Sequence, residues 1–474
     1  MRYDVAIIGA GVVGAMAARE LSRYDLKICL LEKENDVAMG ASRANSGIIH
    51  GGYDPIPGTM KARMNTAGVP LLYEAARELN VHYKNNGSFV CAFSEEENTA
   101  IDELYDRGLV NGIRDLQILS GHEARAMEPN LSDAVTRVLY IPSGGIICPY
   151  DLTIAAVGNA MDNGVELLRN FEVVSISEGF TVTAADGRSV ECGYLLNCAG
   201  GYSDRIARML GDDFFTVDPR AGEYLLLDKT EGVRVKHTIF QVPSREGKGI
   251  LVSPTVDGNL LTGPTATRVD TPESTQTTAE GLATVARLAA KSVPSLDFRQ
   301  VITSFSGVRS SSDVHDFVIR PSESMPKCVH LGAIESPGLT SCVAIAKHAV
   351  ELLSQQGLTL TAKADWKGTR ENTRTFREMT DEEKDAFIKA HPDYGKIVCR
   401  CENVSEGEIR AAIRRNPPAL DVDSVKRRTR SGMGRCQGGF CSPYVIKLLA
   451  EEWGIPMTEV TKSGPGSEII SGKL

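Results

Sequence analysis

The first 32 residues constrain the fold of this chain more than any other segment. An apolar run at residues 3–8 is followed at once by Gly-Ala-Gly-Val-Val-Gly at residues 9–14. An amphipathic stretch then reaches residue 21, and a second apolar run at residues 27–31 ends at Glu32. This order predicts a strand, a glycine turn, a helix and a second strand ending in an acid, which is the unit that binds dinucleotides.

Each part of this unit has a separate physical task. Gly9 permits the tight turn, Gly11 lets a pyrophosphate approach the helix N-terminus, and Gly14 lets the helix pack closely on the strand. Glu32 is placed to accept hydrogen bonds from an adenosine ribose. The unit fits FAD and NAD equally well, and a glycine-rich turn without a ligand is the alternative.

Length and composition limit the partners. A chain of 474 residues is expected to form roughly two to three domains. Its net charge of -9 argues against nucleic acid or an acidic membrane face as the main partner. We find no apolar run of about 18 residues that would predict a transmembrane helix, and the N-terminus lacks the layout of a signal peptide. We therefore expect a cytoplasmic protein; peripheral membrane association through a partner, and homo- or hetero-oligomerisation, stay open.

Two further glycine-bearing segments favour FAD over NAD. Residues 194–204 are typical of a buried strand, a turn and a helix that begins near Ser203, and residues 328–340 lead into an apolar helix at 341–353. With the N-terminal unit, three strand–turn segments return to one site, as an extended dinucleotide with a fused ring system requires. The helix after Pro337 would aim its positive end at the flavin pyrimidine, where reduction builds negative charge.

Four short segments carry a family resemblance. They are Ala-Ser-Arg-Ala-Asn-Ser-Gly-Ile-Ile-His-Gly-Gly at 41–52, Pro-Gly-Thr-Met-Lys-Ala-Arg at 57–63, Asn-Cys-Ala-Gly-Gly-Tyr-Ser-Asp at 197–204 and Gly-Glu-Tyr-Leu-Leu-Leu at 222–227. Over about residues 1–355 the chain thus resembles the D-amino-acid-oxidase-type superfamily of flavoproteins. Within it, the chain is most similar to the glycerol-3-phosphate dehydrogenase and L-2-hydroxyglutarate dehydrogenase branches.

The resemblance implies an α/β fold with an inserted domain. Residues 248–259 are typical of a hairpin and, with residues 223–227, predict an antiparallel sheet on the substrate side of the flavin. The implied domains are a Rossmann-like FAD-binding domain at about residues 1–85, 145–215 and 325–355, and a mixed or antiparallel-sheet substrate domain at about 86–144 and 216–324.

The resemblance also implies the site residues. The segment from Ser42 to Gly52 would run along the flavin, with His50 near its isoalloxazine ring, and Arg309 would bind the substrate anion. The residues expected to contact FAD are Gly9, Gly11, Val12, Val13, Gly14, Glu32, Lys33, Ala41, Ser42, Asn45, Ser46, Gly47, Ile49, Val173, Cys198, Ala199, Gly200, Gly307, Gly338, Leu339 and Thr340.

His50 and Arg309 each have a catalytic or binding interpretation and a structural one. As a general base, His50 would take a hydroxyl proton while hydride leaves the same carbon for the flavin; the alternative is a histidine that only hydrogen-bonds the cofactor. Arg309 could grip a carboxylate or phosphate with two parallel bonds, or serve as a structural ion-pair arginine. Lys248 could help to bind an anion, or be a solvated lysine.

The C-terminal part has a different character. Residues 356–394 are polar and predict a linker with one surface helix from Thr380, which Glu383 would help to cap. Four clustered cysteines follow in a C-x-C and C-x4-C arrangement: Cys399, Cys401, Cys436 and Cys441. Paired thiolates suit zinc or an iron–sulfur cluster, although zinc ribbons usually carry C-x2-C; free or disulfide-bonded cysteines are a third reading. The other seven cysteines are expected to be buried, reduced thiols.

The second resemblance concerns this module. Arg-Thr-Arg-Ser-Gly-Met-Gly-Arg-Cys-Gln-Gly at residues 428–438 resembles the small helical [2Fe-2S] domain of bacterioferritin-associated ferredoxin. The resemblance implies a [2Fe-2S]-binding domain at 395–456, held by the four cysteines, and a C-terminal tail at 457–474. The basic residues at 426–430 could favour the anionic cluster or an acidic redox partner, or form a solvated face.

Together these features predict an FAD-dependent dehydrogenase. A flavin accepts two electrons and a [2Fe-2S] cluster carries one, so we expect electrons to leave for a redox partner protein, a second flavoprotein subunit or a quinone-side acceptor rather than oxygen. The resemblance favours a small anionic substrate, first glycerol 3-phosphate, oxidised to glycerone phosphate. L-2-hydroxyglutarate or another 2-hydroxy acid, an amine or amino acid, and an electron-transfer subunit without a substrate of its own are the alternatives.

Overall fold

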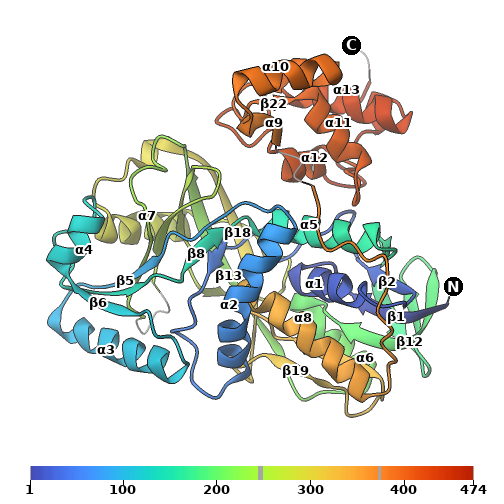
Figure 1. The fold of residues 1–474 in the computed structure, drawn as a ribbon, viewed down its shortest axis with the longest axis horizontal. Helices are drawn as coiled ribbons and strands as arrows, with labels where there is room; N and C mark the ends of the chain where they lie inside the picture. Colours follow the sequence, from blue (N-terminus) through green and yellow to red (C-terminus); the bar gives the residue numbers. More distant parts are fainter. Residues whose placement is uncertain (1, 244–248, 372–374, 473–474) are drawn as a thin grey trace.

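The computed structural model describes residues 2–243, 249–371 and 375–472, which form two large sheets and a C-terminal lobe (Figure 1). We call these the parallel-sheet domain, the antiparallel-sheet domain and the C-terminal domain. None of the helices in these ranges is both long and apolar enough to cross a lipid bilayer.

The parallel-sheet domain surrounds an eight-stranded sheet. Its parallel strands are β9 (Glu166–Leu168), β2 (Ile28–Leu31), β1 (Arg2–Ile8), β12 (Ser189–Asn197) and β20 (Cys328–Gly332). Antiparallel pairs at its edges come from β10 (Val173–Ile176), β11 (Thr181–Ala184) and β19 (Val318–Pro321). The helices are α1 (Val12–Leu21), α2 (Met60–Glu78), α5 (Pro149–Asp162), α6 (Ser203–Met209) and α8 (Gly338–Gln355), with a 3-10 turn at Gly200–Tyr202.

The N-terminal unit has the predicted form. β1 lies between β12 and β2, and α1 packs on α5 and α8 over one continuous apolar core. The helix expected at 341–353 begins earlier, at Gly338, with Pro337 as its N-cap. A proline suits this place because the first N–H groups of a helix have no partner within it.

The antiparallel-sheet domain surrounds a nine-stranded sheet that is mixed, because β14 pairs parallel with β5 while its other pairs are antiparallel. Its strands are β5 (Ser88–Ala92), β6 (Gln117–Ser120), β7 (Arg137–Ile141), β13 (Val217–Leu227), β14 (Thr238–Gln241), β15 (Leu251–Pro254), β16 (Leu260–Gly263), β17 (Thr267–Arg268) and β18 (Val301–Ser312). Its helices are α3 (Glu95–Val110), α4 (Gly121–Met127) and α7 (Ala279–Ser292), with a 3-10 turn at Phe298–Gln300. A small sheet joins both domains through β3 (Ile48–Ile49), β8 (Gly145–Ile147) and β4 (Tyr83–Lys84).

The hairpin predicted at 248–259 is present as β15 and β16, which pair antiparallel. The turn between them closes when the Gly258 N–H donates to the Thr255 carbonyl. Lys248 lies outside the described residues.

The segment at residues 356–394, predicted as a polar linker, contacts both parts of the molecule that it connects. After α8 it runs back across the parallel-sheet domain, where the Trp366 indole N–H donates to Ser22 Oγ at 3.1 Å and Arg19 donates to the Gly368 carbonyl at 2.8 Å. Further on, the rings of Phe387 and Tyr394 meet edge to face, with centroids 4.9 Å apart, inside the C-terminal domain. The segment therefore packs on both bodies that it connects.

The C-terminal domain is small and mostly helical. Its helices are α9 (Thr375–Glu378), α10 (Asp381–Ala390), α11 (Glu406–Arg414), α12 (Val422–Thr429) and α13 (Ser442–Trp453), with 3-10 turns at Pro392–Gly395 and Met457–Glu459. A two-stranded sheet joins β21 (Ile397–Cys399) to β22 (Val404–Ser405). The predicted capping box of α10 is confirmed: Thr380 and Glu383 each bind the other's backbone N–H.

Buried ion pairs fasten this domain to the body, next to α5 (Figure 1). Asp36, 1 % exposed in its side chain, binds Arg427 at 2.6 Å and Arg428 at 2.8 Å. Although burial alone would raise the pKa of Asp36, the two guanidinium groups hold it below its usual range. The arginines of the basic stretch at 426–430 thus point into the molecule, and the reading of this stretch as a solvated or partner-binding face is wrong for Arg427 and Arg428.

Candidate active site

A cavity of about 1270 Å³ is lined by residues of both large sheets. Twenty of the predicted site residues line it: Gly9, Gly11, Val12, Val13, Glu32, Lys33, Ala41, Ser42, Asn45, Ser46, Gly47, His50, Val173, Cys198, Ala199, Gly200, Gly307, Arg309, Gly338 and Leu339. Gly14, Ile49 and Thr340 are not among its lining residues. Most of the predicted site residues therefore line one cavity.

Close backbone approach explains the glycines of the first turn. A Cβ on Gly9, whose φ is +102°, would lie 2.4 Å from the Cys198 carbonyl oxygen, and one on Gly14 would lie 1.9 Å from the Gly9 carbonyl oxygen. Gly11 is the N-cap of α1 and has no side chain with which to cap it, while Ser42 Oγ accepts from the Val12 N–H at 2.9 Å. This cradle suits an anionic pyrophosphate at the start of α1.

Glu32 lies at the end of β2 with its carboxylate buried. One oxygen accepts from the Ala10 N–H at 2.8 Å and the other from the Glu34 N–H at 3.0 Å. Burial raises the pKa of Glu32 to about 7, although these two hydrogen bonds lower it. Each oxygen keeps a further lone pair for a ribose hydroxyl. Lys33 beside it donates to the Tyr202 hydroxyl at 3.2 Å.

The loop at residues 41–47 is held by its own side chains and by β18. Asn45 accepts from the Gly47 N–H at 2.8 Å and donates to the Ala41 carbonyl at 2.9 Å. A Cβ on Gly307 would lie 1.8 Å from the Ala44 carbonyl oxygen. Gly307 is therefore required for the approach of this loop to β18, which is a structural reason for a glycine two residues before Arg309.

His50 follows this loop and is fixed on two sides. Its backbone N–H donates to Thr340 Oγ1 at 2.9 Å, and its carbonyl accepts from Asn65 at 3.1 Å. Its ring Nε2 lies 3.3 Å from Ser336 Oγ, and its ring centroid lies 5.9 Å from that of Phe240. The imidazole is thus oriented in the cavity wall, where it could hold a proton.

Arg309 lies on β18 at the same cavity. Its guanidinium donates to the Thr265 carbonyl at 3.5 Å and to the Tyr224 hydroxyl, which leaves further N–H donors for another acceptor. Tyr224, from the neighbouring β13, stacks on Phe305 with ring centroids 4.7 Å apart and has its hydroxyl 3.2 Å from Ser46 Oγ. Burial raises the pKa of Tyr224, and the positive charge of Arg309 opposes that rise.

Three lining residues near His50 and Arg309 had no predicted role: Tyr224, Phe240 and Ser336. Tyr224 and Ser336 lay inside quoted motifs without a role, and Phe240 lay in no motif at all. Thr340 was predicted as a cofactor contact, but the structure places it behind His50, whose backbone it holds. The motif positions alone could have raised Tyr224 and Ser336 as candidates.

The four clustered cysteines form two pairs. Cys401 and Cys436 have their sulfur atoms 3.8 Å apart, and Cys399 is hydrogen-bonded to Cys441. That bond, with backbone hydrogen bonds from Gly432 and Glu402, lowers the pKa of the Cys399 thiol to about 5, which favours the thiolate that binds metal.

This pairing bears on which metal the cysteines hold. Two thiol pairs suit a binuclear cluster with two cysteines on each iron.

The remaining cysteines are buried and form no disulfide bonds, as expected: Cys29, Cys91, Cys148, Cys192, Cys198, Cys328 and Cys342. Burial raises the thiol pKa of Cys192 and Cys342 to about 12. These thiols are therefore protonated and inert at neutral pH.

Comparisons with known proteins identify a family for each part of the chain. The family described as FAD dependent oxidoreductase matches residues 4–352, and the family described as BFD-like [2Fe-2S] binding domain matches residues 397–451.

Individual relatives give the same picture. The glycerol 3-phosphate dehydrogenase of Caloramator mitchellensis is 44% identical over 473 residues, which cover 99% of this chain and 98% of that protein. The mitochondrial L-2-hydroxyglutarate dehydrogenase of Homo sapiens is 31% identical over 286 residues, 56% of this chain and 61% of that one. The dithionite-reduced L-alpha-glycerophosphate oxidase of Mycoplasma pneumoniae, a structure with FAD bound, is 33% identical, with a TM-score of 0.75 over 78% of this chain and 98% of that chain.

Proposed function

We propose, from the premise that this chain belongs to the family of FAD-dependent oxidoreductases and carries a BFD-like [2Fe-2S] binding domain, that it is a glycerol 3-phosphate dehydrogenase. The product would be glycerone phosphate, and the electrons would leave through the cluster. The observation that carries this proposal is the cavity in which His50 and Arg309 share one wall with the glycine turn. The relative that matches almost the whole chain, C-terminal domain included, carries the same activity in its name.

The residues present fit the two cofactors. The start of α1, the Glu32 carboxylate and the loop at 41–47 would hold FAD, and the two cysteine pairs would hold the cluster. When bound, FAD supplies the hydride acceptor for the alcohol carbon and can pass electrons on singly.

Two side chains would act on the substrate. Arg309 would bind the phosphate with parallel N–H bonds and so place the neighbouring secondary alcohol in the cavity. His50 would accept the proton of that hydroxyl, because its backbone and its ring are both held in place. Tyr224 would narrow the cavity beside Arg309.

A 2-hydroxy acid is the second candidate substrate class. A carboxylate presents two oxygens to a guanidinium much as a phosphate does, so Arg309 does not by itself distinguish the two. The similarity to L-2-hydroxyglutarate dehydrogenase favours this alternative over an amine or amino acid.

The acceptor would be a small protein with an acidic face around its own redox centre. Cys401 is exposed, and the neighbouring Phe440 is 88% exposed, so this edge of the cysteine site reaches the surface. Arg400 and Arg435 are exposed beside these residues, so a negatively charged carrier would fit here. A second flavoprotein subunit or a quinone-side acceptor is the alternative.

The substrate proposal is tested by anaerobic visible spectra of the purified protein. Glycerol 3-phosphate, L-2-hydroxyglutarate and a panel of amino acids are added separately, with glycerol as the uncharged control. We expect glycerol 3-phosphate to bleach the flavin bands fastest. Faster bleaching by a hydroxy acid or an amino acid would replace the proposed substrate, and bleaching by none would favour an electron-transfer subunit.

A further inference from the structure

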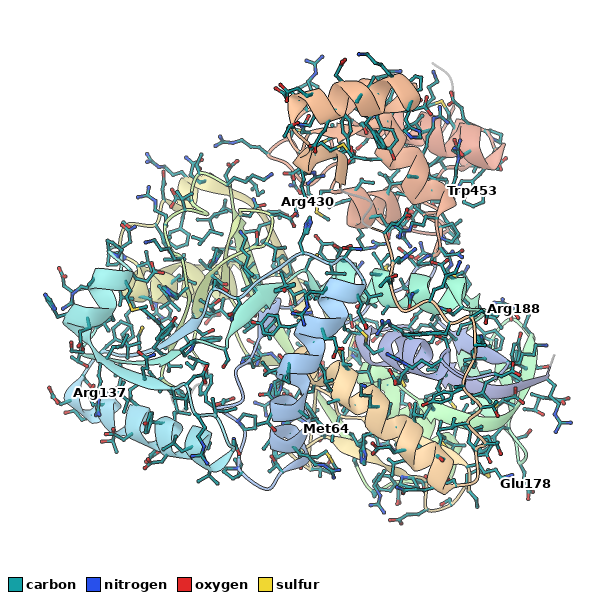
Figure 2. All side chains as sticks on the ribbon, viewed as in Figure 1. Met64, Arg137, Glu178, Arg188, Arg430 and Trp453 are labelled. Atoms are coloured by element: carbon teal, nitrogen blue, oxygen red, sulfur yellow. The ribbon has the colours of Figure 1, made fainter. Side chains whose placement is uncertain are left out.

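Arg430 joins two domains through one buried guanidinium (Figure 2). From the end of α12 it binds Asp257 at 2.7 Å and Asn259 at 3.1 Å, both in the turn between β15 and β16 of the antiparallel-sheet domain. On the other side it binds Glu402 at 2.8 Å, within the C-terminal domain. Its side chain is 6% exposed.

The backbone of Arg430 has a conformation that is uncommon for a residue other than glycine. Its φ is +69°, so it adopts the left-handed conformation that ends many helices. Glycine adopts this conformation at no steric cost, whereas an arginine there carries strain. An arginine at such a position indicates that its contacts compensate for the strain.

Glu402 places a buried negative charge next to the clustered cysteines. It lies between Cys401 and Asn403, and its side chain is 2% exposed. A buried carboxylate is costly unless a cation is close. Lys229 also reaches Glu402, at 3.1 Å, but its side chain is 44% exposed, so Arg430 is the better-buried partner.

The turn that Arg430 holds connects two strands whose opposite ends reach the active-site cavity. Leu251 of β15 lines this cavity, as does Pro264, which follows β16. Asn259, which Arg430 contacts, is itself anchored by its bond to the Leu227 carbonyl at 3.0 Å. Arg430 therefore connects the cysteine loop to an anchored turn of the antiparallel-sheet domain.

We propose that Arg430 is a positioning residue for the cluster: it fixes the cysteine loop at 399–403 against the turn at 255–259 and offsets the negative charge of Glu402. A positive charge near an iron–sulfur cluster favours the reduced form, and a negative charge disfavours it. Arg430 would thus keep the cluster able to accept electrons from the flavin. This last point rests on the proposed function, whereas the contacts and the charge balance do not.

The test is a redox titration of the full-length protein with dithionite, followed by EPR of the reduced cluster. We expect Arg430→Gln to lower the midpoint potential by a tenfold change in the reduction equilibrium, about 59 mV for one electron. Glu402→Gln should raise it, and the double variant should return close to the wild-type value. Arg414→Gln, which removes a 64% exposed arginine of the same domain, is the matched control and should leave the potential unchanged.

Two results would overturn the proposal: an unchanged potential in Arg430→Gln, or a double variant as low as the single one. If Arg430→Gln does not retain its cluster, Asp257→Asn tests the tie from the other domain. We expect at least tenfold faster hydrogen exchange at residues 399–403 in that variant, and unchanged exchange would contradict the tie. The titration uses no substrate, so failure of glycerol 3-phosphate to react would leave its outcome unaffected.

Discussion

The flavin crevice and the cysteine site are built by opposite means. The crevice takes its shape from backbone packed on a large apolar core: Gly9, Gly14 and Gly307 each lie where a Cβ would overlap a carbonyl oxygen. The cysteine site lies in a small domain whose attachment to the body depends on buried charges, Asp36 and Arg430 among them. Close backbone packing therefore determines the shape of the crevice, whereas buried ion pairs determine the position of the cysteine site.

This difference separates the two half-reactions. Changes in the crevice should alter substrate oxidation and leave the cluster in place. Changes in the cysteine site or its ion pairs should alter electron exit and leave flavin reduction in place. A single variant that impairs both substrate oxidation and electron exit would contradict this separation.

The largest expected effect is that of Cys399→Ser. Cys399 is buried and paired with Cys441, so its loss would remove a proposed ligand from the buried side of the site. We expect complete loss of the cluster absorbance and EPR signal, with full FAD content and normal bleaching by substrate. Cys342→Ser, in the core of α8, is the control and should keep the cluster; a loaded cluster in Cys399→Ser would contradict the ligand assignment.

His50→Gln should slow the oxidation of the substrate and leave the cluster unaffected. Removal of a general base typically costs about 10²–10⁴-fold in rate, and glutamine cannot take a proton. Stopped-flow bleaching of the flavin by glycerol 3-phosphate measures this loss, with FAD and iron contents as controls. Bleaching at the wild-type rate would show that His50 only lines the cofactor.

Asp36→Asn should loosen the attachment of the C-terminal domain. The substitution leaves Arg427 and Arg428 buried without a counter-charge, which typically costs about 3–5 kcal/mol. Denaturant unfolding followed by the cluster absorbance reports this free energy. Asp186→Asn, which breaks an exposed pair with Arg188, is the matched control, and equal behaviour of the two variants would contradict a charge-held interface.

The smallest of the four effects is expected for Gly307→Ala. The added Cβ would lie 1.8 Å from the Ala44 carbonyl oxygen, so the loop at 41–47 must shift, at about 1–3 kcal/mol for overpacking. We expect a lower FAD content and melting temperature with the cluster intact. Gly40→Ala has open space around its Cβ and should retain its FAD; wild-type FAD content in Gly307→Ala would contradict the shape argument.

Local patterns predicted much of the fold from the sequence. The strand, glycine turn and helix at residues 2–21 depend on neighbouring residues, and the capping box at Thr380 depends on a spacing of three. The family resemblance added the remaining segments of the crevice, including His50 and Arg309, which line one cavity in the structure.

Long-range pairings were beyond sequence reasoning. Asp36 and Arg427 are 391 residues apart, so nothing local showed that the basic stretch faces inward. Phe240 reaches the cavity because β14 pairs with β5, a register that no motif records. Thr340 and Ile49 lie in the predicted segments, but packing turns them behind the wall.

The proposed electron path leads from the substrate through the flavin to the cluster. Its most direct test is anaerobic mixing with glycerol 3-phosphate, followed by visible absorbance and by EPR of samples frozen during the reaction. We expect flavin bleaching first and then the signal of a reduced [2Fe-2S] cluster. Bleaching without any cluster signal, in protein shown by iron analysis to be loaded, would contradict the claim.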